Sequence, residues 1–184
     1  MATELAPSLL VAMDLVFDPN FRRSVVLMLE HEVGQGALGL IVNRRSDFSM
    51  VQLCQNLDVA WRGASDVCAD WGGPVGENQG WVLMDDEAAR GLEVVRIAPG
   101  LHWTRSQDAL RRVAETPALR ARVFLGYAGW GPGQLEREIV EGSWLVVPVE
   151  SRLLYEESHE RLWEQAVRSL GIEPATLVPS QGIN

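Results

Sequence analysis

The sequence contains no lysine, because all 16 of its basic residues are arginine. A Walker A loop needs a lysine on the phosphates, a protein kinase needs a strand lysine, and a pyridoxal enzyme needs a lysine for its Schiff base. The composition therefore excludes these three classes.

Cysteines and long apolar runs are also scarce. Cys54 and Cys68 are too few for a disulfide scaffold and lack zinc-binding spacing, so we expect two reduced thiols with no bond between them. No apolar run approaches the roughly 20 residues that cross a membrane. The N-terminal stretch carries Glu4 and no basic residue before its apolar part, which is not typical of a secretory signal. We expect a cytoplasmic protein without membrane association.

The formal net charge is −9 at neutral pH. This charge opposes a partner dominated by phosphate, since nucleic-acid binders need a concentrated positive surface. Arginine pairs at 22–23, 44–45 and 111–112 could still form a local patch. The charge balance argues against direct nucleic-acid binding.

Familiar catalytic and metal-binding motifs are absent. Ser65 and Ser143 lack the G-x-S-x-G frame of a hydrolase nucleophile. His159-Glu160 begins like a zinc-protease helix, but the second histidine is missing. Nothing supplies a third ligand beside Glu30-His31-Glu32. The sequence thus indicates no catalytic residue, no metal site and no cofactor.

Short apolar stretches alternate with turn residues along the 184-residue chain, which we interpret as a single domain over residues 1–184. Strands outnumber helices and occur in runs, a pattern typical of an α+β fold with a mainly antiparallel or mixed sheet. Strands are predicted near 8–13, 24–30, 37–43, 66–71, 79–84, 92–97, 101–104, 123–127 and 143–147. Helices are predicted at about 50–56, 106–115, 134–141 and 158–170.

The most distinctive segment has four glycines between Gly126 and Gly133, interleaved with Tyr127 and Trp130. It follows a predicted strand and precedes a predicted helix, where free N–H groups can hold an anion. Two carboxylates in the first turns of that helix, Glu136 and Glu138, would face such an anion. We therefore favour a compact turn whose aromatic rings pack inward, with an anion site as the alternative.

Several blocks occur together and in order along the chain: 18–26, 30–31, 36–44, 72–75, 124–136 and 143–145. In combination they resemble the YqgE/AlgH family of small bacterial proteins over about residues 8–172. Met84 stands where a histidine is common in that family. The resemblance implies an irregular, flattened β-barrel of mixed strands with helices packed on the outside. It implies no defined biochemical activity and no catalytic residue.

Three functions follow as hypotheses. The first is a non-catalytic regulatory or interaction protein that binds an unknown protein partner through the segments 126–136, 72–75 and 18–23. The second is a protein that binds, or acts on, a phosphate-bearing ligand at the Gly126–Gly133 turn, with an arginine as the anion clamp. The third is a transcriptional regulator that contacts DNA directly. The candidate binding residues are Arg22, Arg23, Asn43, Arg44, Gly73, Pro74, Tyr127, Trp130, Gly131 and Gln134.

Overall fold

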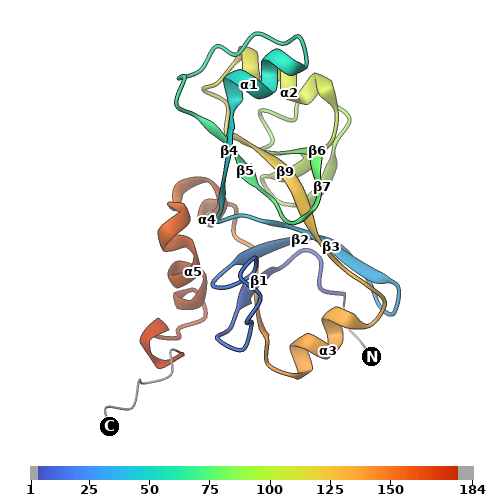
Figure 1. The fold of residues 1–184 in the computed structure, drawn as a ribbon, viewed down its shortest axis with the longest axis vertical. Helices are drawn as coiled ribbons and strands as arrows, with labels where there is room; N and C mark the ends of the chain where they lie inside the picture. Colours follow the sequence, from blue (N-terminus) through green and yellow to red (C-terminus); the bar gives the residue numbers. More distant parts are fainter. Residues whose placement is uncertain (1–3, 178–184) are drawn as a thin grey trace. The chain divides into compact units, whose positions relative to one another are not determined.

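The computed structural model describes residues 4–177, which divide into two compact units. Unit 1 comprises residues 4–43 and 129–177, and unit 2 comprises residues 44–128. Figure 1 shows the elements of both units along the chain. In the described part, no helix is both long and apolar enough to cross a membrane.

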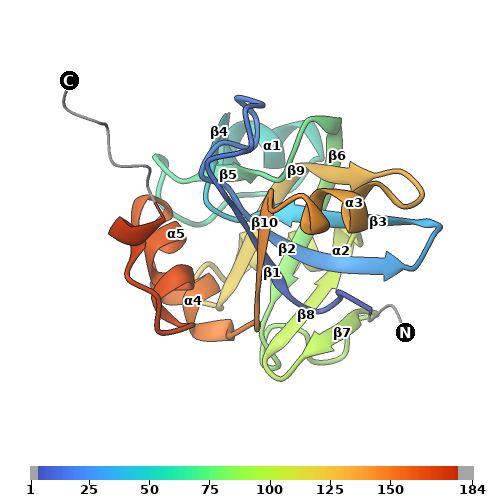
Figure 2. The ribbon, with the colours of Figure 1, turned by 90° about the horizontal axis from the view of Figure 1, so that it is seen from below.

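Unit 1 is built on four strands in the order β10 (Trp144–Val147), β1 (Leu9–Ala12), β2 (Val25–Glu32) and β3 (Gly36–Ile41). Neighbouring strands in this order are antiparallel, and Figure 2 shows β10, β1 and β2 side by side. All four side chains of β1 are buried. This explains why the strand is a continuous apolar run instead of an alternating one.

Helices α3 (Gln134–Val140), α4 (Ser151–Glu156) and α5 (His159–Arg168) belong to unit 1, as does a 3₁₀ turn at Pro174–Thr176. One face of α5 is apolar at helical spacing and buries Leu162, Trp163, Ala166 and Val167. The Trp163 indole Nε1–H donates a 2.9 Å hydrogen bond to the Ala12 carbonyl oxygen. This bond attaches α5 to β1.

Unit 2 contains β4 (Arg45–Ser49), β5 (Cys68–Trp71), β6 (Val75–Met84), β7 (Val95–Ala98), β8 (Leu101–Thr104) and most of β9 (Ala121–Trp130). The order is β4-β5-β9-β6-β8-β7, and only the β5–β9 pair of this sheet is parallel. Helices α1 (Met50–Asn56) and α2 (Gln107–Glu115) cover its core. Each helix begins after a capping serine, Ser49 and Ser106 respectively.

The structure confirms the α+β class, the mixed strand directions and the four predicted helices, and it adds β4 and α4, which the sequence analysis missed. The predicted barrel was wrong, because the sheet is open. Strands β10 and β7, which end the strand order, have only four residues each. Strands this short offer few backbone N–H and C=O groups for the hydrogen bonds that would close a sheet into a barrel. Whether residues 1–184 act as a single domain stays a prediction.

A buried ion pair links two strands of unit 2. The Arg122 guanidinium on β9 contacts Oδ2 of Asp70 on β5 at 2.7 and 2.8 Å, and both side chains are largely buried. The same guanidinium lies 4.9 Å from the centre of the Phe124 ring. Removing one charge of a buried pair leaves the other uncompensated.

We predict that Asp70→Asn lowers the free energy of unfolding by about 3–5 kcal/mol, because it removes the carboxylate that faces the largely buried Arg122 guanidinium. Urea denaturation measures this loss. Asp47→Asn, at an exposed position of β4, is the control and should change stability by less than about 0.5 kcal/mol.

Hydrogen exchange on the same variant tests the single-domain prediction. If the chain unfolds as one domain, Asp70→Asn speeds the slowest amide exchange in β1 and β2 of unit 1 as well as in β9. Faster exchange in unit 2 alone would mean that the units unfold independently.

Candidate functional site

The glycine-rich segment is largely strand. Strand β9 continues through Gly126 and Gly129 to Trp130, so only residues 131–133 form the turn before α3. The prediction of a turn over Gly126–Gly133 was therefore wrong for its first five residues. Gly126 adopts a φ of +72°, and a Cβ there would overlap the carbonyl oxygen of Gly73. Glycine allows the two backbones to cross at this point.

Gly73, Pro74 and Tyr127 lie together at the same crossing in unit 2. Gly73 has a φ of +148°, and a Cβ on it would overlap the backbone of Tyr127. The Tyr127 ring packs edge-on against Trp81, with 5.8 Å between the ring centres. Gly73 and Tyr127 therefore have a clear structural role.

In unit 1, three aromatic rings from distant parts of the sequence form a cluster. Phe21 lies 6.2 Å from Trp130 and 5.9 Å from Trp144, and the two tryptophans are 5.8 Å apart, all measured between ring centres. Trp130 and Trp144 are buried, whereas Phe21 is half-buried. The blocks 18–26, 124–136 and 143–145, which carry the family resemblance, each contribute one of these rings.

Glu138 of α3 satisfies both indoles of this cluster. Its Oε2 accepts hydrogen bonds from Nε1 of Trp130 at 2.9 Å and from Nε1 of Trp144 at 2.8 Å. Its Oε1 accepts from the Gln134 amide at 2.8 Å, and the Gln134 carbonyl oxygen accepts from the Gly131 backbone N–H at 3.1 Å. The polar groups around the start of α3 are therefore bonded to one another.

The cluster forms the floor of a small surface pocket of about 240 Å³, lined by Phe17, Asp18, Phe21 and both tryptophans among others. Apolar side chains at its edge are exposed, with 86% of Phe17 and 57% of Leu15 open to solvent. Leu15 lies beside Gly142, just after the end of α3. We call Leu15, Phe17, Phe21, Trp130 and Trp144 the aromatic face.

The candidate arginines are engaged within the protein. Arg23 stacks on the Trp163 ring at 4.4 Å and lies 3.9 Å from a Glu164 carboxylate oxygen. Arg22 and Arg44 each have a partner within the protein. Asn43 accepts a hydrogen bond from the Val25 backbone N–H and donates one to the Arg23 carbonyl oxygen, which holds Arg23 at a positive φ of 52°.

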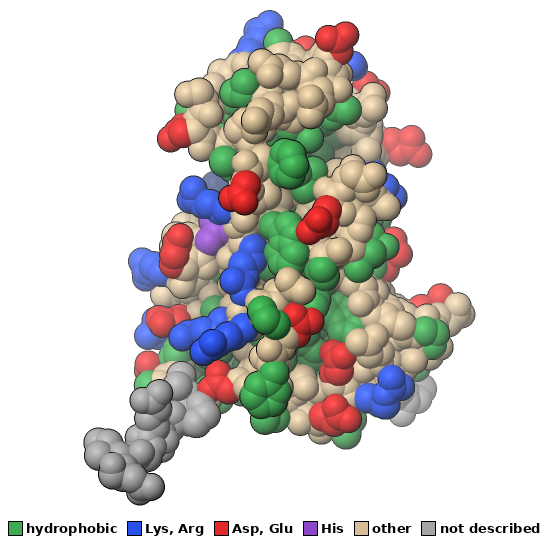
Figure 3. Space-filling view, in the orientation of Figure 1, with side chains coloured by type: hydrophobic (Ala, Val, Ile, Leu, Met, Phe, Trp, Pro, Cys, Tyr) green, Lys and Arg blue, Asp and Glu red, His purple; other side chains and the backbone are tan. Residues whose placement is uncertain are grey.

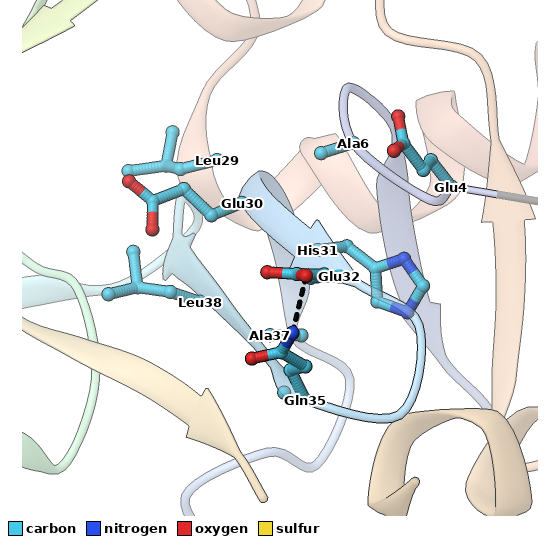
Figure 4. Close-up of a pocket in the computed structure, with 10 residues that line it drawn as sticks. Glu4, Ala6, Leu29, Glu30, His31, Glu32, Gln35, Ala37 and Leu38 are labelled. Atoms are coloured by element: carbon cyan, nitrogen blue, oxygen red, sulfur yellow. Dashed lines mark hydrogen bonds between the residues drawn. The ribbon is translucent and has the colours of Figure 1, made fainter. Parts of the chain in front are cut away.

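A second hollow of unit 1 has a volume of about 540 Å³ and is lined mainly by residues of the β2–β3 hairpin. Figure 4 shows Glu30 and Glu32 on one side of β2, with His31 pointing away from both. The Glu32 carboxylate accepts a hydrogen bond from Gln35. Across residues 4–177 no group of histidines, cysteines and carboxylates is arranged to hold a metal ion.

His31 has a structural role in unit 1, where it bonds to two other segments of the chain. Its side chain is only 1% exposed. Its Nδ1 accepts from the Leu5 backbone N–H at 3.1 Å, so the neutral ring donates through Nε2 to Glu136 Oε1 at 3.3 Å. The same carboxylate accepts from the Gly34 N–H at 3.2 Å. Hydrogen bonds from the backbone amides of Glu136 and Gly34, followed by that from His31, lower the pKa of Glu136.

The ten candidate residues thus fall into two groups. Arg44, Gly73, Pro74 and Tyr127 lie in unit 2, and the other six lie in unit 1. Within unit 1, Trp130, Gly131 and Gln134 share one hydrogen-bonded network, and Asn43 contacts Arg23. Three residues of this site, Phe21, Glu138 and Trp144, were not among the ten candidates, although Phe21 lies in the predicted interaction segment 18–23. Phe21 and Trp144 lie in the resemblance blocks, which was the available signal.

Comparisons with known proteins agree with the resemblance. The model of the DUF179 family, described as AlgH-like, matches residues 9–175. A UPF0301 protein of Myxococcus xanthus is 43% identical over 182 residues, which is 98% of each chain. The solution structure of the AlgH protein from Pseudomonas aeruginosa superposes with a TM-score of 0.77 at 31% identity, covering 100% of this chain and 98% of that one. A crystal structure of a Corynebacterium diphtheriae protein gives 0.72 at 26% identity, covering 92% and 89%.

The open mixed sheet with its helices is therefore a fold shared with solved bacterial proteins. The chain belongs to the YqgE/AlgH family, whose members here carry names that specify no biochemical activity.

We predict that Glu136→Gln makes unfolding less sensitive to acid. Because the folded pKa of Glu136 is lowered, its stabilising effect is present above the unfolded-state pKa of about 4.3 and is lost as the pH falls through the folded pKa. Urea unfolding at pH 7 and at several values between about 5 and 3 should show a smaller loss in the variant. Glu141→Gln, an exposed residue just after α3, should keep the parent's pH dependence. Parallel profiles for the parent and Glu136→Gln would contradict this.

Proposed function

We propose that this protein is a non-catalytic regulatory or interaction protein that binds a protein partner through the aromatic face of unit 1. The observation that carries the proposal is the exposure of Phe17 and Leu15 beside a pocket floored by Phe21, Trp130 and Trp144. Large apolar side chains held at the surface beside a structured pocket are typical of interaction sites.

The physical properties of the aromatic face suit this role. Its tryptophans are fixed by Glu138, so a partner would meet a preorganised surface and lose little side-chain entropy there. Aromatic residues in well-packed pockets dominate the binding energy of many interfaces. The pocket of about 240 Å³ suits one inserted side chain instead of a whole ligand.

The charges near the pocket favour a particular kind of partner. Asp18 lines the pocket, Asp14 is exposed two residues before Val16, and the chain as a whole carries −9. The partner segment therefore presents an apolar side chain flanked by basic residues. The attraction between opposite charges speeds association, and the repulsion between like charges disfavours acidic competitors. Figure 3 shows acidic side chains beside arginines on the face drawn, with hydrophobic groups between them.

The proposal includes action in the cytoplasm, with residues 1–184 as one domain. The formal net charge of −9 weighs against direct nucleic-acid contact. A phosphate-bearing ligand at the Gly126–Gly133 turn is the alternative. The Gly131 N–H already bonds to Gln134, and Glu136 and Glu138 follow, which weigh against it. Stabilisation by nucleotides or sugar phosphates in a thermal-shift screen would favour this alternative.

Photo-crosslinking in the producing bacterium tests the proposal. A photoreactive phenylalanine analogue replaces Phe17, and the same analogue at Val95 of unit 2, which is 49% exposed, serves as the control. We predict a discrete light-dependent adduct with one protein at position 17 and none at position 95. The purified partner should then bind the parent chain at least about tenfold more tightly than Phe17→Asp.

Equal labelling at both positions would contradict the proposal, as would an adduct partner whose affinity is unchanged by Phe17→Asp.

A further inference from the structure

A larger groove lies in unit 2, separate from the aromatic face. It encloses about 660 Å³, within the range of pockets that hold small molecules. Its apolar lining comes from both helices and two strands, with Leu53 of α1, Leu110 of α2, and Trp81 and Leu125 of β6 and β9. Amide, hydroxyl and charged side chains lie at its edge.

One edge of the groove carries a positive charge. The Arg105 guanidinium lies 4.9 Å from the Trp81 ring centre and donates to the Gln79 side-chain oxygen at 3.1 Å. Both partners are uncharged, so in the described chain no carboxylate pairs with Arg105. An arginine balanced only by an aromatic ring and an amide, in a chain of net charge −9, is well suited to receive an anion.

Trp81 provides the second observation. Its side chain is 3% exposed, and its ring lies beneath the Arg105 guanidinium, which is thereby held at the edge of the groove. The groove therefore combines an apolar lining with a held guanidinium that no carboxylate of the described residues balances.

We infer that this groove binds a small amphipathic carboxylate, with an apolar body against Leu53, Leu110 and Leu125 and an anionic head at Arg105. A carboxylate matches the planar guanidinium in a bidentate pair. Glu77 lies on the same edge, so a singly charged head is favoured over a dianionic phosphate. No such site is required by the partner interaction proposed for unit 1.

Calorimetric titration of the full chain with octanoate tests this inference. We expect saturable one-to-one binding, with octanol and octyl phosphate each at least about tenfold weaker. Arg105→Gln should weaken octanoate binding roughly ten- to a hundredfold, since it removes a charged hydrogen-bond donor. Arg111→Gln is the matched control, because Arg111 is an arginine of α2 that lies outside the groove and pairs with Asp108.

Gly80→Leu tests the location independently. Gly80 lines the groove, and a Cβ added there meets no atom within 4 Å, so the larger side chain should fill the groove without unfolding the chain. This variant should keep its unfolding midpoint and lose octanoate binding. In ¹⁵N spectra of the parent, octanoate should shift the Trp81 indole signal and leave that of Trp163 unchanged.

The inference would be overturned by the absence of saturable octanoate binding, by equal binding to Arg105→Gln, or by tighter binding of octanol or octyl phosphate. Unchanged binding to a folded Gly80→Leu variant would also overturn it. None of these results would affect the crosslinking test of the aromatic face.

Discussion

The hydrogen bonds from two tryptophans to one carboxylate are the constraint on which unit 1 depends. Burying an indole contributes much apolar contact, but its N–H must find an acceptor. Glu138 provides that acceptor for both Trp130 and Trp144. Because Trp130 ends β9, Trp144 begins β10 and Glu138 lies on α3 between them, this arrangement fixes the strand–helix–strand segment from residue 130 to residue 144.

The surface of unit 1 follows from this arrangement. With both indoles held, Phe21 packs against their rings, and the Met13 N–H bonds to the Ser143 carbonyl oxygen at 2.9 Å. The segment that follows Met13 therefore runs past the start of β10 toward Gly142 and leaves Leu15 and Phe17 exposed. The exposed apolar side chains lie over a rigid floor, which is the combination that protein interfaces use for their central contacts.

Local patterns in the sequence were enough to predict most of the fold, but not the features that depend on distant partners. The helices predicted at 50–56 and 106–115 match α1 and α2 to within one residue, and the strand predicted near 8–13 is β1. The continuation of β9 through Gly126 could not be predicted, because Gly73, which approaches it, lies more than fifty residues earlier. The expected barrel came from family resemblance alone. At the site, Trp130 and Gln134 were predicted, whereas Phe21 and Trp144 were missed because only tertiary packing brings their rings together.

The most direct test of the account is the state of the two indole N–H groups when Glu138 is replaced. In ¹⁵N spectra of the parent chain, the Nε1–H signals of Trp130 and Trp144 should exchange slowly with solvent. Glu138→Leu removes the shared acceptor, and both signals should then move and exchange faster while the Trp163 signal, whose N–H bonds to Ala12, stays in place. Unchanged positions and exchange rates for Trp130 and Trp144 in a folded Glu138→Leu variant would contradict the account.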